Sequence, residues 1–535
     1  MLYPARSHAQ KTFKELLNLL PANERDKPHV ILMAGGVVEY RNDTDREIVF
    51  RQESNFYYLS GCHVPASFLL ASSQHGTSLE QNPALDLFIP KAELADIMWS
   101  VPPPSLDVAK ATHDATHIDH PSALHSAVET LIKALPGALF HTLPKEHPHF
   151  PALPSDLILQ VQGGGGAITD AYLLPALHRA RLTKDAYEIS EIRQANAISS
   201  RAHEVVMRVL GEAVQGKIKR DAAAGVDRPP LPREWLIQTE GEAEAIFAAS
   251  TRREGSIHQA YPPIVAASVR ASTLHYCCND KAFAWGPIKP HDHLNRGQLD
   301  SESIQPQVLL IDAGCEWNCY ASDITRTMPV GNGGKFTPEA REMYELVLQM
   351  QKESFDAIKP GLHWDAVQLI CHRVLVKGFQ RLGIFKSPTD DGSGSWNSEE
   401  AILASGISSA FFPHGVGHSL GMDVHDVPSA SKPEKNSTIP SLTLGNESLY
   451  TYLRLRLPLE VGMVVTVEPG IYFSPHLLAA VRDSSHINHD VLNRYEEVGG
   501  IRIEDVIHIT EDGFENLTTV KSSVDWVEAV CSGNA

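Results

Sequence analysis

The sequence has few cysteines, and no two of them are spaced as in a CxxC pair. The seven lie scattered along the 535 residues, at Cys62, Cys277, Cys278, Cys315, Cys319, Cys371 and Cys531. An odd, scattered set fits reduced thiols better than a disulfide framework or a structural zinc site. We therefore expect a cytoplasmic protein.

Long hydrophobic runs are also missing. No stretch approaches the ~18 apolar residues of a transmembrane helix, and residues 1–17 contain no apolar core long enough for a signal peptide. These two absences predict a soluble intracellular protein with no membrane partner.

The sequence has fewer basic than acidic residues. The chain has 46 Lys and Arg against 65 Asp and Glu, a net charge of −19 at pH 7. This acidic balance favours solubility and argues against nucleic acid or an anionic membrane as a partner. The chain is also longer than one ordinary domain, so we expect two domains with insertions.

The N-terminal third shows no catalytic cluster. The glycine run at 163–166 has neither the GxGxxG spacing nor a following GK[ST], so we interpret it as a flexible loop. A helical pattern at 12–20 and apolar runs at 29–34, 68–71 and 85–89 predict helix and strands in alternation. We expect an α/β domain over residues 1–178.

A second domain is expected over residues 179–535. Thr183 can N-cap a long amphipathic helix just after the boundary. We interpret four polar stretches that contain helix- and strand-breaking residues as insertions, at 214–234, 287–303, 387–398 and 429–447. None of them contains a catalytic or binding motif.

Two aspartates are the central feature of the sequence of the second domain. An apolar run at 308–311 delivers Asp312, a turn region follows at 314–318, and a β-favouring run at 320–330 carries Asp323. On the two arms of one hairpin these carboxylates can face each other across the ladder. Like charges brought together in this way need a cation between them. Taken alone, the pair has an equally good interpretation as unrelated surface residues beside a turn.

Four further acidic or imidazole positions follow in order. His414 and His418 are four residues apart, but the glycines at 415 and 417 oppose a helix and instead allow close backbone approach. Glu468 ends the β-branched run 464–467 before a Pro-Gly turn. Glu504 lies in an apolar strand pattern, where a carboxylate is costly unless it pairs with a cation.

The ordered set of two Asp, one His and two Glu matches the ligands of a pair of divalent ions such as Mn²⁺, Co²⁺ or Zn²⁺. Two ions a few ångström apart make a water nucleophilic near neutral pH and polarise a carbonyl. Glu468 can then act as a proton shuttle. Either His425 or His414 can hydrogen-bond the carbonyl oxygen as charge develops.

This order of ligands resembles the pita-bread metallopeptidases, in particular their prolidase and aminopeptidase P branch. Residues 50–61 (FRQESNFYYLSG) look like the N-terminal-domain signature of that branch, and residues 258–264 (HQAYPPI) and 273–276 (TLHY) also match. The resemblance covers nearly the whole chain. It implies an α/β N-terminal domain followed by an α+β pita-bread (creatinase/aminopeptidase) catalytic domain.

The resemblance also implies roles for the site residues. Asp312 is a terminal ligand of one metal, Asp323 and Glu504 bridge, and His418 and Glu468 complete the other metal. His275, His414 and His425 fall on the substrate-facing histidines of the family, and Arg502 falls on its site arginine. Two divalent ions per subunit, Mn²⁺ foremost, proline-containing peptides and a homo-oligomer are the cofactors and partners that we expect.

Several functions stay open. We favour an aminopeptidase that releases the residue before a penultimate proline, over a prolidase that cleaves free Xaa-Pro dipeptides. Two features favour a prolidase. One is the long separation in sequence between Glu468 and Glu504, and the other is Arg454, which falls where prolidases bind the terminal carboxylate of the dipeptide. Arg456 beside it argues instead for a solvated strand edge. Methionine aminopeptidases share the five ligands but typically lack the N-terminal domain. Binding modules of the same fold have lost ligands that this chain retains.

Overall fold

The computed structural model describes residues 2–73, 82–217, 234, 236–283, 304–388, 396–433 and 446–535. The chain forms two compact units, Met1–Thr183 and Lys184–Ala535. Of the four expected insertions, 287–303 lies wholly outside the described residues and the other three lie partly outside them. In the part of the chain that the structure describes, no helix is both long and apolar enough to cross a bilayer.

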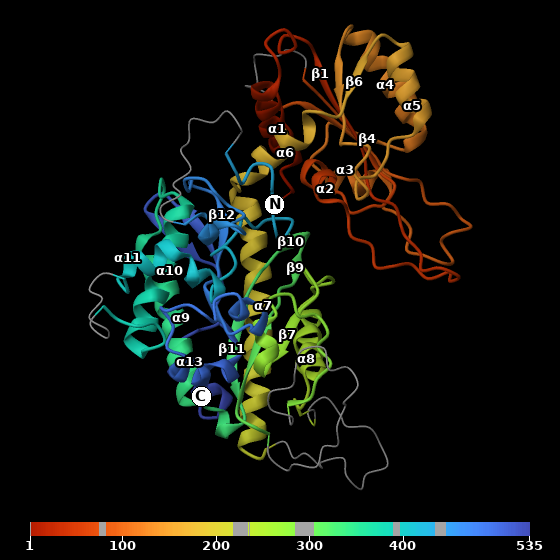
Figure 1. The fold of residues 1–535 in the computed structure, drawn as a ribbon. Helices are drawn as coiled ribbons and strands as arrows, with labels where there is room; N and C mark the ends of the chain where they lie inside the picture. Colours follow the sequence, from red (N-terminus) through yellow and green to blue (C-terminus); the bar gives the residue numbers. More distant parts are fainter. Residues whose placement is uncertain are drawn as a thin grey trace. The chain divides into compact units, whose positions relative to one another are not determined.

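The first unit alternates helices and strands (Figure 1). Its elements are α1 (Ala5–Leu19), β1 (His29–Ala34), α2 (Ser54–Ser60), β2 (Phe68–Ser73), β3 (Ala84–Phe88), α3 (Leu106–Thr112), β4 (His117–Asp119), η1 (Pro121–Ala123), α4 (Leu124–Ala134), β5 (Leu139–His141), α5 (Ser155–Gly163), β6 (Ala167–Thr169) and α6 (Leu173–Leu182). The apolar runs expected to be strands at 29–34 and 68–71 fall in β1 and β2, and the run expected at 85–89 falls in β3 up to Phe88. The expected helix at 12–20 is the second half of α1, and the glycine run at 163–166 ends α5 and leads into β6.

One six-stranded sheet organises this unit, in the order β4-β3-β2-β1-β5-β6. The central pairs β1–β2 and β2–β3 are antiparallel, whereas β1–β5, β3–β4 and β5–β6 are parallel. Val30 and Phe140 of the sheet pack with Val128 of α4 and Leu157 of α5 in an apolar core. The unit is therefore an α/β layer built on a mixed sheet.

The second unit contains the remaining elements. They are α7 (Ala186–Val214), α8 (Glu240–Arg253), β7 (Ile264–Ala267), η3 (Ser268–Ser272), β8 (Gln307–Asp312), β9 (Glu316–Trp317), β10 (Tyr320–Ala321), β11 (Thr325–Val330), η5 (Asn332–Gly334), α9 (Pro338–Ala357), α10 (Trp364–Leu382), α11 (Glu399–Ser405), η6 (Ile407–Ala410), η7 (Glu447–Tyr450), β12 (Val464–Val467), β13 (Gly470–Tyr472), α12 (Pro475–Ala479), α13 (His489–Tyr495), η8 (Glu496–Val498), β14 (Gly500–Arg502), β15 (Asp505–Thr510), β16 (Gly513–Asn516) and α14 (Val524–Cys531).

The long helix α7 begins later than the sequence pattern indicates. Its N-cap is Asp185, whose side chain accepts from the Glu188 backbone N–H, and the Glu188 side chain accepts from the Asp185 N–H in return. This capping box satisfies two of the free N–H groups at the helix start. Thr183 was the wrong cap, because the Asp and Glu pair three residues apart provides the stronger local signal.

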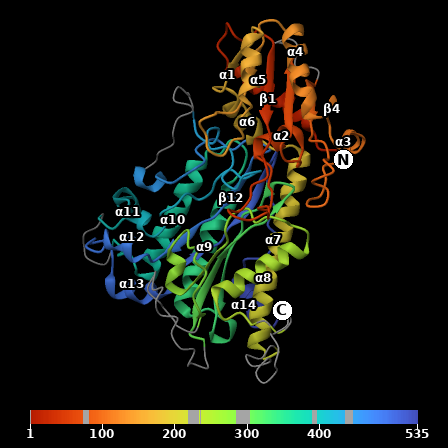
Figure 2. The ribbon, with the colours of Figure 1, turned by 90° about the vertical axis from the view of Figure 1, so that its right-hand side faces the viewer.

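The strands of the second unit form short antiparallel sheets, in the orders β11-β8-β7 and β12-β15-β16, with the pairs β13–β14 and β9–β10. The helices α9 and α10 pack side by side, and α7 packs along α8 (Figures 1 and 2). β8 delivers Asp312 and β12 leads to Glu468. The sheets therefore bring together residues that lie more than 150 positions apart in the sequence.

The expected pairing of the two aspartates across one ladder is wrong in detail. Asp312 lies opposite Thr325, and Asp323 precedes β11. The residues between β8 and β11 form a second small hairpin, β9–β10, whose turn at Asn318 and Cys319 has positive φ angles of 47° and 64°. Positive φ at both turn residues matches a two-residue type I′ turn. The extra hairpin places Asp323 beside the end of the β8–β11 ladder.

Candidate active site

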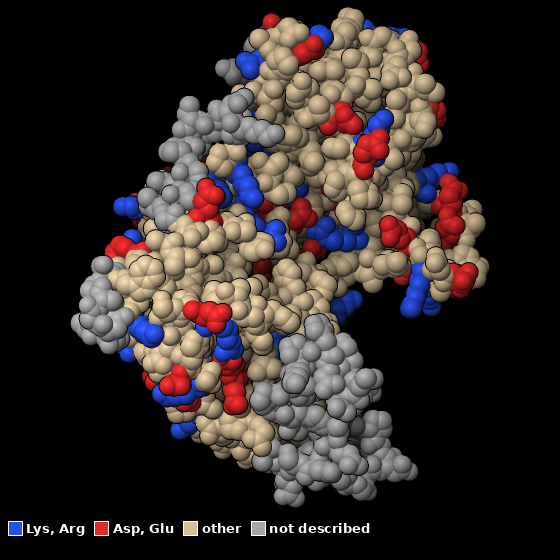
Figure 3. Space-filling model, in the orientation of Figure 1, with Lys and Arg blue, Asp and Glu red and all other residues tan. Residues whose placement is uncertain are grey.

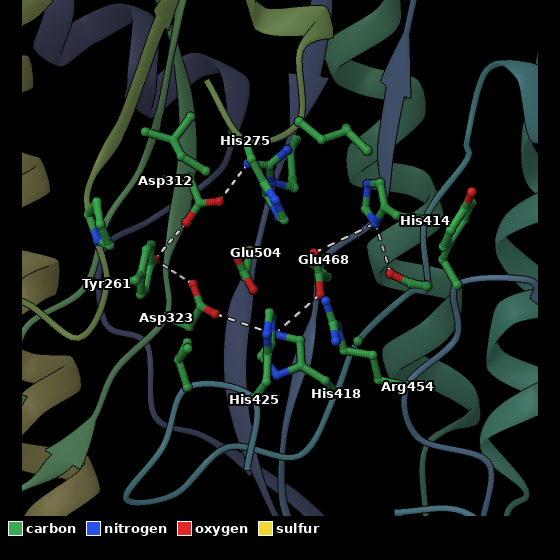
Figure 4. Close-up of a pocket in the computed structure, with 18 of the residues that line it drawn as sticks. Tyr261, His275, Asp312, Asp323, His414, His418, His425, Arg454, Glu468 and Glu504 are labelled. Atoms are coloured by element: carbon green, nitrogen blue, oxygen red, sulfur yellow. Dashed lines mark hydrogen bonds and ion pairs between the residues drawn. The ribbon is translucent and has the colours of Figure 1, made fainter. Parts of the chain in front are cut away.

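A single pocket of about 570 Å³ gathers the residues singled out from the sequence. Its lining includes all ten of them: His275, Asp312, Asp323, His414, His418, His425, Arg454, Glu468, Arg502 and Glu504. They come from strand ends, from the loops after η3 and η6 and from the segment after η7, and they converge on one cavity (Figure 4). None of the ten lies elsewhere in the structure.

Three buried side chains at the centre have the geometry of a cation site. Asp323, His418 and Glu504 each offer a ligand atom, and these atoms all lie within 4.8 Å of one another. His418 Nε2 lies 3.4 Å from Asp323 Oδ2 and 3.5 Å from an oxygen of Glu468. The other ring nitrogen, Nδ1, is 3.1 Å from the Ser419 carbonyl oxygen and donates to it. This tautomer directs the Nε2 lone pair at the carboxylates, as a metal-binding imidazole requires.

The electrostatics of the carboxylates point the same way. Burial raises the pKa of Asp323, Glu468 and Glu504 well above their ordinary values, and repulsion from neighbouring carboxylates raises it further. The guanidinium of Arg502 opposes this for all three groups. A cluster of oxygen donors that repel one another, with one neutral imidazole, fits divalent cations. Burial lowers the pKa of His418 to about 4, so its ring is neutral at pH 7 and available as a ligand.

Arg502 links the carboxylates to a hydrogen-bonded network. Its Nη2 donates to Asp312 Oδ2 at 2.6 Å, its Nη1 to the Tyr472 hydroxyl at 2.8 Å and its Nε to Thr325 Oγ1 at 3.0 Å. Thr325 in turn donates to Glu504 Oε2 at 2.7 Å. Arg502 ends β14, and Glu504, expected within a strand, lies between β14 and β15.

His414 has both ring nitrogens engaged. Nδ1 lies 2.9 Å from the Gly415 carbonyl oxygen and Nε2 lies 2.8 Å from the Tyr472 hydroxyl. Because a carbonyl can only accept, Nδ1 carries the proton, and the Tyr472 O–H donates to Nε2. Tyr472 can do so because it already accepts from Arg502. His414 also lies 3.7 Å from Glu468 Oε2.

His425 and His275 complete the histidine set. The ring of His425 meets that of His418 edge-to-face, with centroids 4.4 Å apart. Burial, together with the neighbouring His418 and Arg454, lowers the pKa of His425 to about 3. His275 lies on an exposed loop at the pocket edge.

The glycines around the histidines allow the close approaches that the sequence indicates. A Cβ at Gly417 would lie 2.0 Å from the Thr466 carbonyl oxygen, and one at Gly415 would lie 2.9 Å from Leu453 Cα. The backbone of 413–418 is not helical. Only glycine therefore lets this loop pack directly against β12 and against the segment that carries Arg454.

Arg454 is exposed and lines the pocket, but it does not lie on a solvated strand edge. Residues 452–456 are outside any strand. The neighbouring Arg456 binds the buried Asp365 through Nε at 3.0 Å and Nη2 at 2.5 Å. Arg456 is thus engaged in an ion pair away from the pocket, and the argument from a shared solvated face was wrong.

Sequence reasoning missed three polar contributors. The Tyr261 hydroxyl lies 2.6 Å from Asp312 Oδ1 and 2.5 Å from Asp323 Oδ1, and Thr325 and Tyr472 join the network of Arg502. Tyr261 lies within the 258–264 motif, and Tyr472 lies two residues after the Pro-Gly turn that follows Glu468. Their positions beside recognised motifs are the only signal that could have found them.

Comparisons with known proteins show the family of the chain. Residues 190–511 match the model of metallopeptidase family M24, and residues 8–140 match the aminopeptidase P N-terminal domain. Similar curated relatives are probable Xaa-Pro aminopeptidases of Pyricularia oryzae (34% identity, covering 99% of this chain and 97% of the relative) and Metarhizium robertsii (36%, covering 99% and 96%).

Solved structures with the same fold include aminopeptidase PepP of Pseudomonas aeruginosa, at 28% identity and a TM-score of 0.68, covering 99% of this chain and 98% of that one. Proline aminopeptidase P II of Yersinia pestis matches at 26% identity and a TM-score of 0.69, covering 98% and 99%. The chain belongs to metallopeptidase family M24, with an aminopeptidase P N-terminal domain ahead of a pita-bread catalytic domain.

Proposed function

We propose that the pocket hydrolyses the bond between an N-terminal residue and a following proline, as a metal-dependent Xaa-Pro aminopeptidase. The observation that carries this proposal is the convergence of Asp312, Asp323, His418, Glu468 and Glu504 on one buried cavity. The full-length similarity to relatives named as Xaa-Pro aminopeptidases supplies the substrate class.

The donor set fits two divalent ions, with Mn²⁺ as the proposed activating metal. Asp312 is assigned to one ion, His418 and Glu468 to the other, and Asp323 and Glu504 to both. When bound, such ions make a water nucleophilic near neutral pH and polarise the scissile carbonyl. Four carboxylates and one imidazole match the preference of Mn²⁺ for hard oxygen with some nitrogen.

The side chains of the chain supply proton transfer and charge stabilisation. Glu468 lies at the centre, between His418 and His414, where it can take a proton from the attacking water and deliver it to the departing proline nitrogen. His414 donates its ring N–H to the Gly415 carbonyl, so His425 is the better donor to the developing oxyanion. Among the described residues, no hydrogen bond engages the ring of His425.

Turnover of a peptide tests the proposal directly. The purified protein, loaded with Mn²⁺, is expected to release the first residue of a Xaa-Pro-Yaa tripeptide and to leave the matching Xaa-Ala-Yaa tripeptide largely intact. Elemental analysis is expected to find about two divalent ions per chain. A metal-replete protein that cleaves neither peptide refutes the proposed function.

The choice between aminopeptidase and dipeptidase depends on Arg454. An arginine can bind the terminal carboxylate of a Xaa-Pro dipeptide bidentately, whereas a longer peptide has no charge at that point. We expect kcat/KM to be higher for the tripeptide, and Arg454→Ala to change that value by less than about threefold. A strong dipeptide preference that Arg454→Ala abolishes makes the protein a prolidase instead.

We further propose proline-containing peptides as the partners, a cytoplasmic location and no nucleic-acid binding. The scattered cysteines support the location. On the face of the molecule drawn in Figure 3, Lys and Arg are interspersed with Asp and Glu and form no continuous basic stripe. Strong phosphate binding needs a concentrated basic surface.

A homo-oligomer is proposed to form through the first unit. Large apolar side chains lie exposed within a short segment, with Leu94 88%, Met98 75%, Trp99 75% and Val101 93% accessible. Apolar clusters of this kind mark association surfaces. Trp99→Glu is expected to lower the mass measured by light scattering to that of a monomer, while the matched Trp396→Glu, at a 57% exposed tryptophan, leaves it unchanged. A wild-type monomer refutes the oligomer.

A further inference from the structure

Gln368 on α10 is buried, and its side-chain amide binds the main chain at three places. Its Oε1 accepts from the Val416 N–H at 2.6 Å. Its Nε2 lies 3.1 Å from the His414 carbonyl oxygen and 2.9 Å from that of Leu449. The side chain is 1% exposed, so each of these bonds replaces one that water cannot supply.

The three contacts belong to two separate walls of the pocket. His414 and Val416 lie in the loop that runs on to His418. Leu449 lies in η7, three residues before the pocket-lining segment that begins at Tyr452. One amide therefore joins both segments to the same point on α10.

The two walls are also in direct contact beyond the amide. A Cβ at Gly415 would lie 2.9 Å from Leu453 Cα and 3.2 Å from the Tyr452 carbonyl oxygen. The Leu453 N–H donates to the Tyr450 carbonyl at 3.0 Å, which fixes the turn between η7 and Arg454. The two segments therefore pack against each other as well as against Gln368. In Figure 4, His414 and Arg454 lie on the same side of the carboxylate cluster.

His372, one turn further along α10, packs against the Gln368 side chain. Its Nε2 lies 3.2 Å from Gln368 Nε2, and its Nδ1 lies 2.9 Å from the Ser408 hydroxyl. The amide nitrogen has two N–H groups, and the His414 and Leu449 carbonyls accept both of them. These main-chain partners fix the orientation of the amide, because only its nitrogen can donate to the two carbonyls and only its oxygen can accept from the Val416 N–H.

We infer that Gln368 is a positioning residue for peptide hydrolysis, whose amide sets the placement of His414 relative to the Arg454 wall. The inference rests on the proposed function for its kinetic consequence and on the contacts above for its structural one. Displacement of a catalytic group by about 1 Å can cost ~10²-fold in rate. Loss of the amide should therefore lower the rate of the chemical step, although Gln368 does not line the pocket.

The test compares Gln368→Glu with Gln380→Glu. Glu has the shape of Gln, but its carboxylate cannot donate to the two carbonyls. Gln380 lies on the same helix, and its Nε2 likewise donates to two main-chain carbonyls, those of Lys386 and Asn397, which lie outside the pocket. Gln368→Glu is expected to lower kcat/KM for a Xaa-Pro-Yaa tripeptide by ~10–100-fold, with both metal ions retained. Gln380→Glu is expected to stay within about twofold of wild type.

A double-mutant cycle separates positioning from general destabilisation. If Gln368 acts through His414, Gln368→Glu costs less than about threefold in a His414→Ala background. Equal losses in both backgrounds, a Gln368→Glu enzyme within twofold of wild type, or an equal loss in Gln380→Glu overturns the inference. Gln368→Met, which carries no charge, serves in the same comparison if Gln368→Glu does not fold.

Hydrogen exchange gives a readout that needs no activity. Gln368→Met should accelerate exchange in peptides covering 413–417 and 449–454, and Gln380→Met should not. If wild type fails to cleave any Xaa-Pro peptide, the proposed function falls, and this exchange result alone decides whether the amide joins the two segments. Unchanged exchange in Gln368→Met refutes the inference even when the wild-type enzyme is active.

Discussion

Asp323→Ala is expected to remove both metal ions and to lower turnover of a Xaa-Pro-Yaa peptide by more than ~10³-fold. One carboxylate oxygen of Asp323 lies 2.5 Å from the Tyr261 hydroxyl and the other lies 3.4 Å from His418 Nε2. Asp323 is therefore placed between the two halves of the donor set, so its loss affects both ions. The expected loss exceeds the ~10²–10³-fold that a single oxyanion donor contributes. Elemental analysis of dialysed protein and initial rates measure the two effects.

Asp365→Ala is the matched control for this change. Asp365 is also a fully buried aspartate of the second unit, but it pairs with Arg456 and does not line the pocket. Its loss should lower the melting temperature, since an unpaired buried Arg456 is costly, while both ions stay bound. Asp323→Ala protein that still carries two ions per chain contradicts the bridging assignment. The same substitution at Glu504 is expected to behave as Asp323→Ala does.

The residues of the proposed donor set could be singled out from the sequence because several of them lie beside or within a strong local signal. Asp312 and Glu468 come at the ends of apolar β-branched runs, and Glu504 is a charge within an apolar pattern. Such runs become buried strands whatever the rest of the fold does, so the charged residue beside each one stands out. The N-terminal strands His29–Ala34 and Ala84–Phe88 were predictable for the same reason.

The relations between these segments could not be read in the same way. The strand break before Asp323 depends on a two-residue turn at Asn318 and Cys319, and cysteine is not a typical turn residue. The contacts of Tyr261 with two aspartates join positions 51 and 62 residues apart. Only the register of β7 against β8, in which Ile264 lies opposite Asp312, brings Tyr261 to that point.

The sequence also could not predict which ring nitrogen of each histidine carries the proton. His414 and His425 were equal candidates for hydrogen-bonding the substrate carbonyl. The distinction between them comes from the Gly415 carbonyl, which takes the ring proton of His414 at 2.9 Å. A bond from a ring to the backbone of the next residue depends on local φ and ψ, for which a single sequence carries no signal.

His425→Ala is expected to lower kcat by ~10²–10³-fold and to leave both metal ions bound. The ring of His425 packs edge-to-face on that of His418 and lines the same cavity (Figure 4). Among the described residues, no carboxylate of the donor set forms an ion pair with His425, whereas Asp323 and Glu468 both lie close to His418. Burial lowers its pKa to about 3, so at pH 7 it is a neutral ring that can donate one N–H to a developing oxyanion. KM should change little, because the interaction strengthens only as charge develops.

His418→Ala provides the contrast that gives the His425 result its meaning. His418 directs Nε2 at Asp323 and Glu468 while Nδ1 donates to the Ser419 carbonyl, so its loss should weaken metal binding by at least the ~10–100-fold that even an outer-shell partner contributes. Titration of metal-free protein with Mn²⁺, followed by calorimetry, measures this directly. The roles assigned to the two histidines are reversed if His425→Ala loses its ions while His418→Ala retains them. If both variants bind Mn²⁺ as wild type does, His418 is not a ligand, and only its kcat can then say whether it takes part in the reaction.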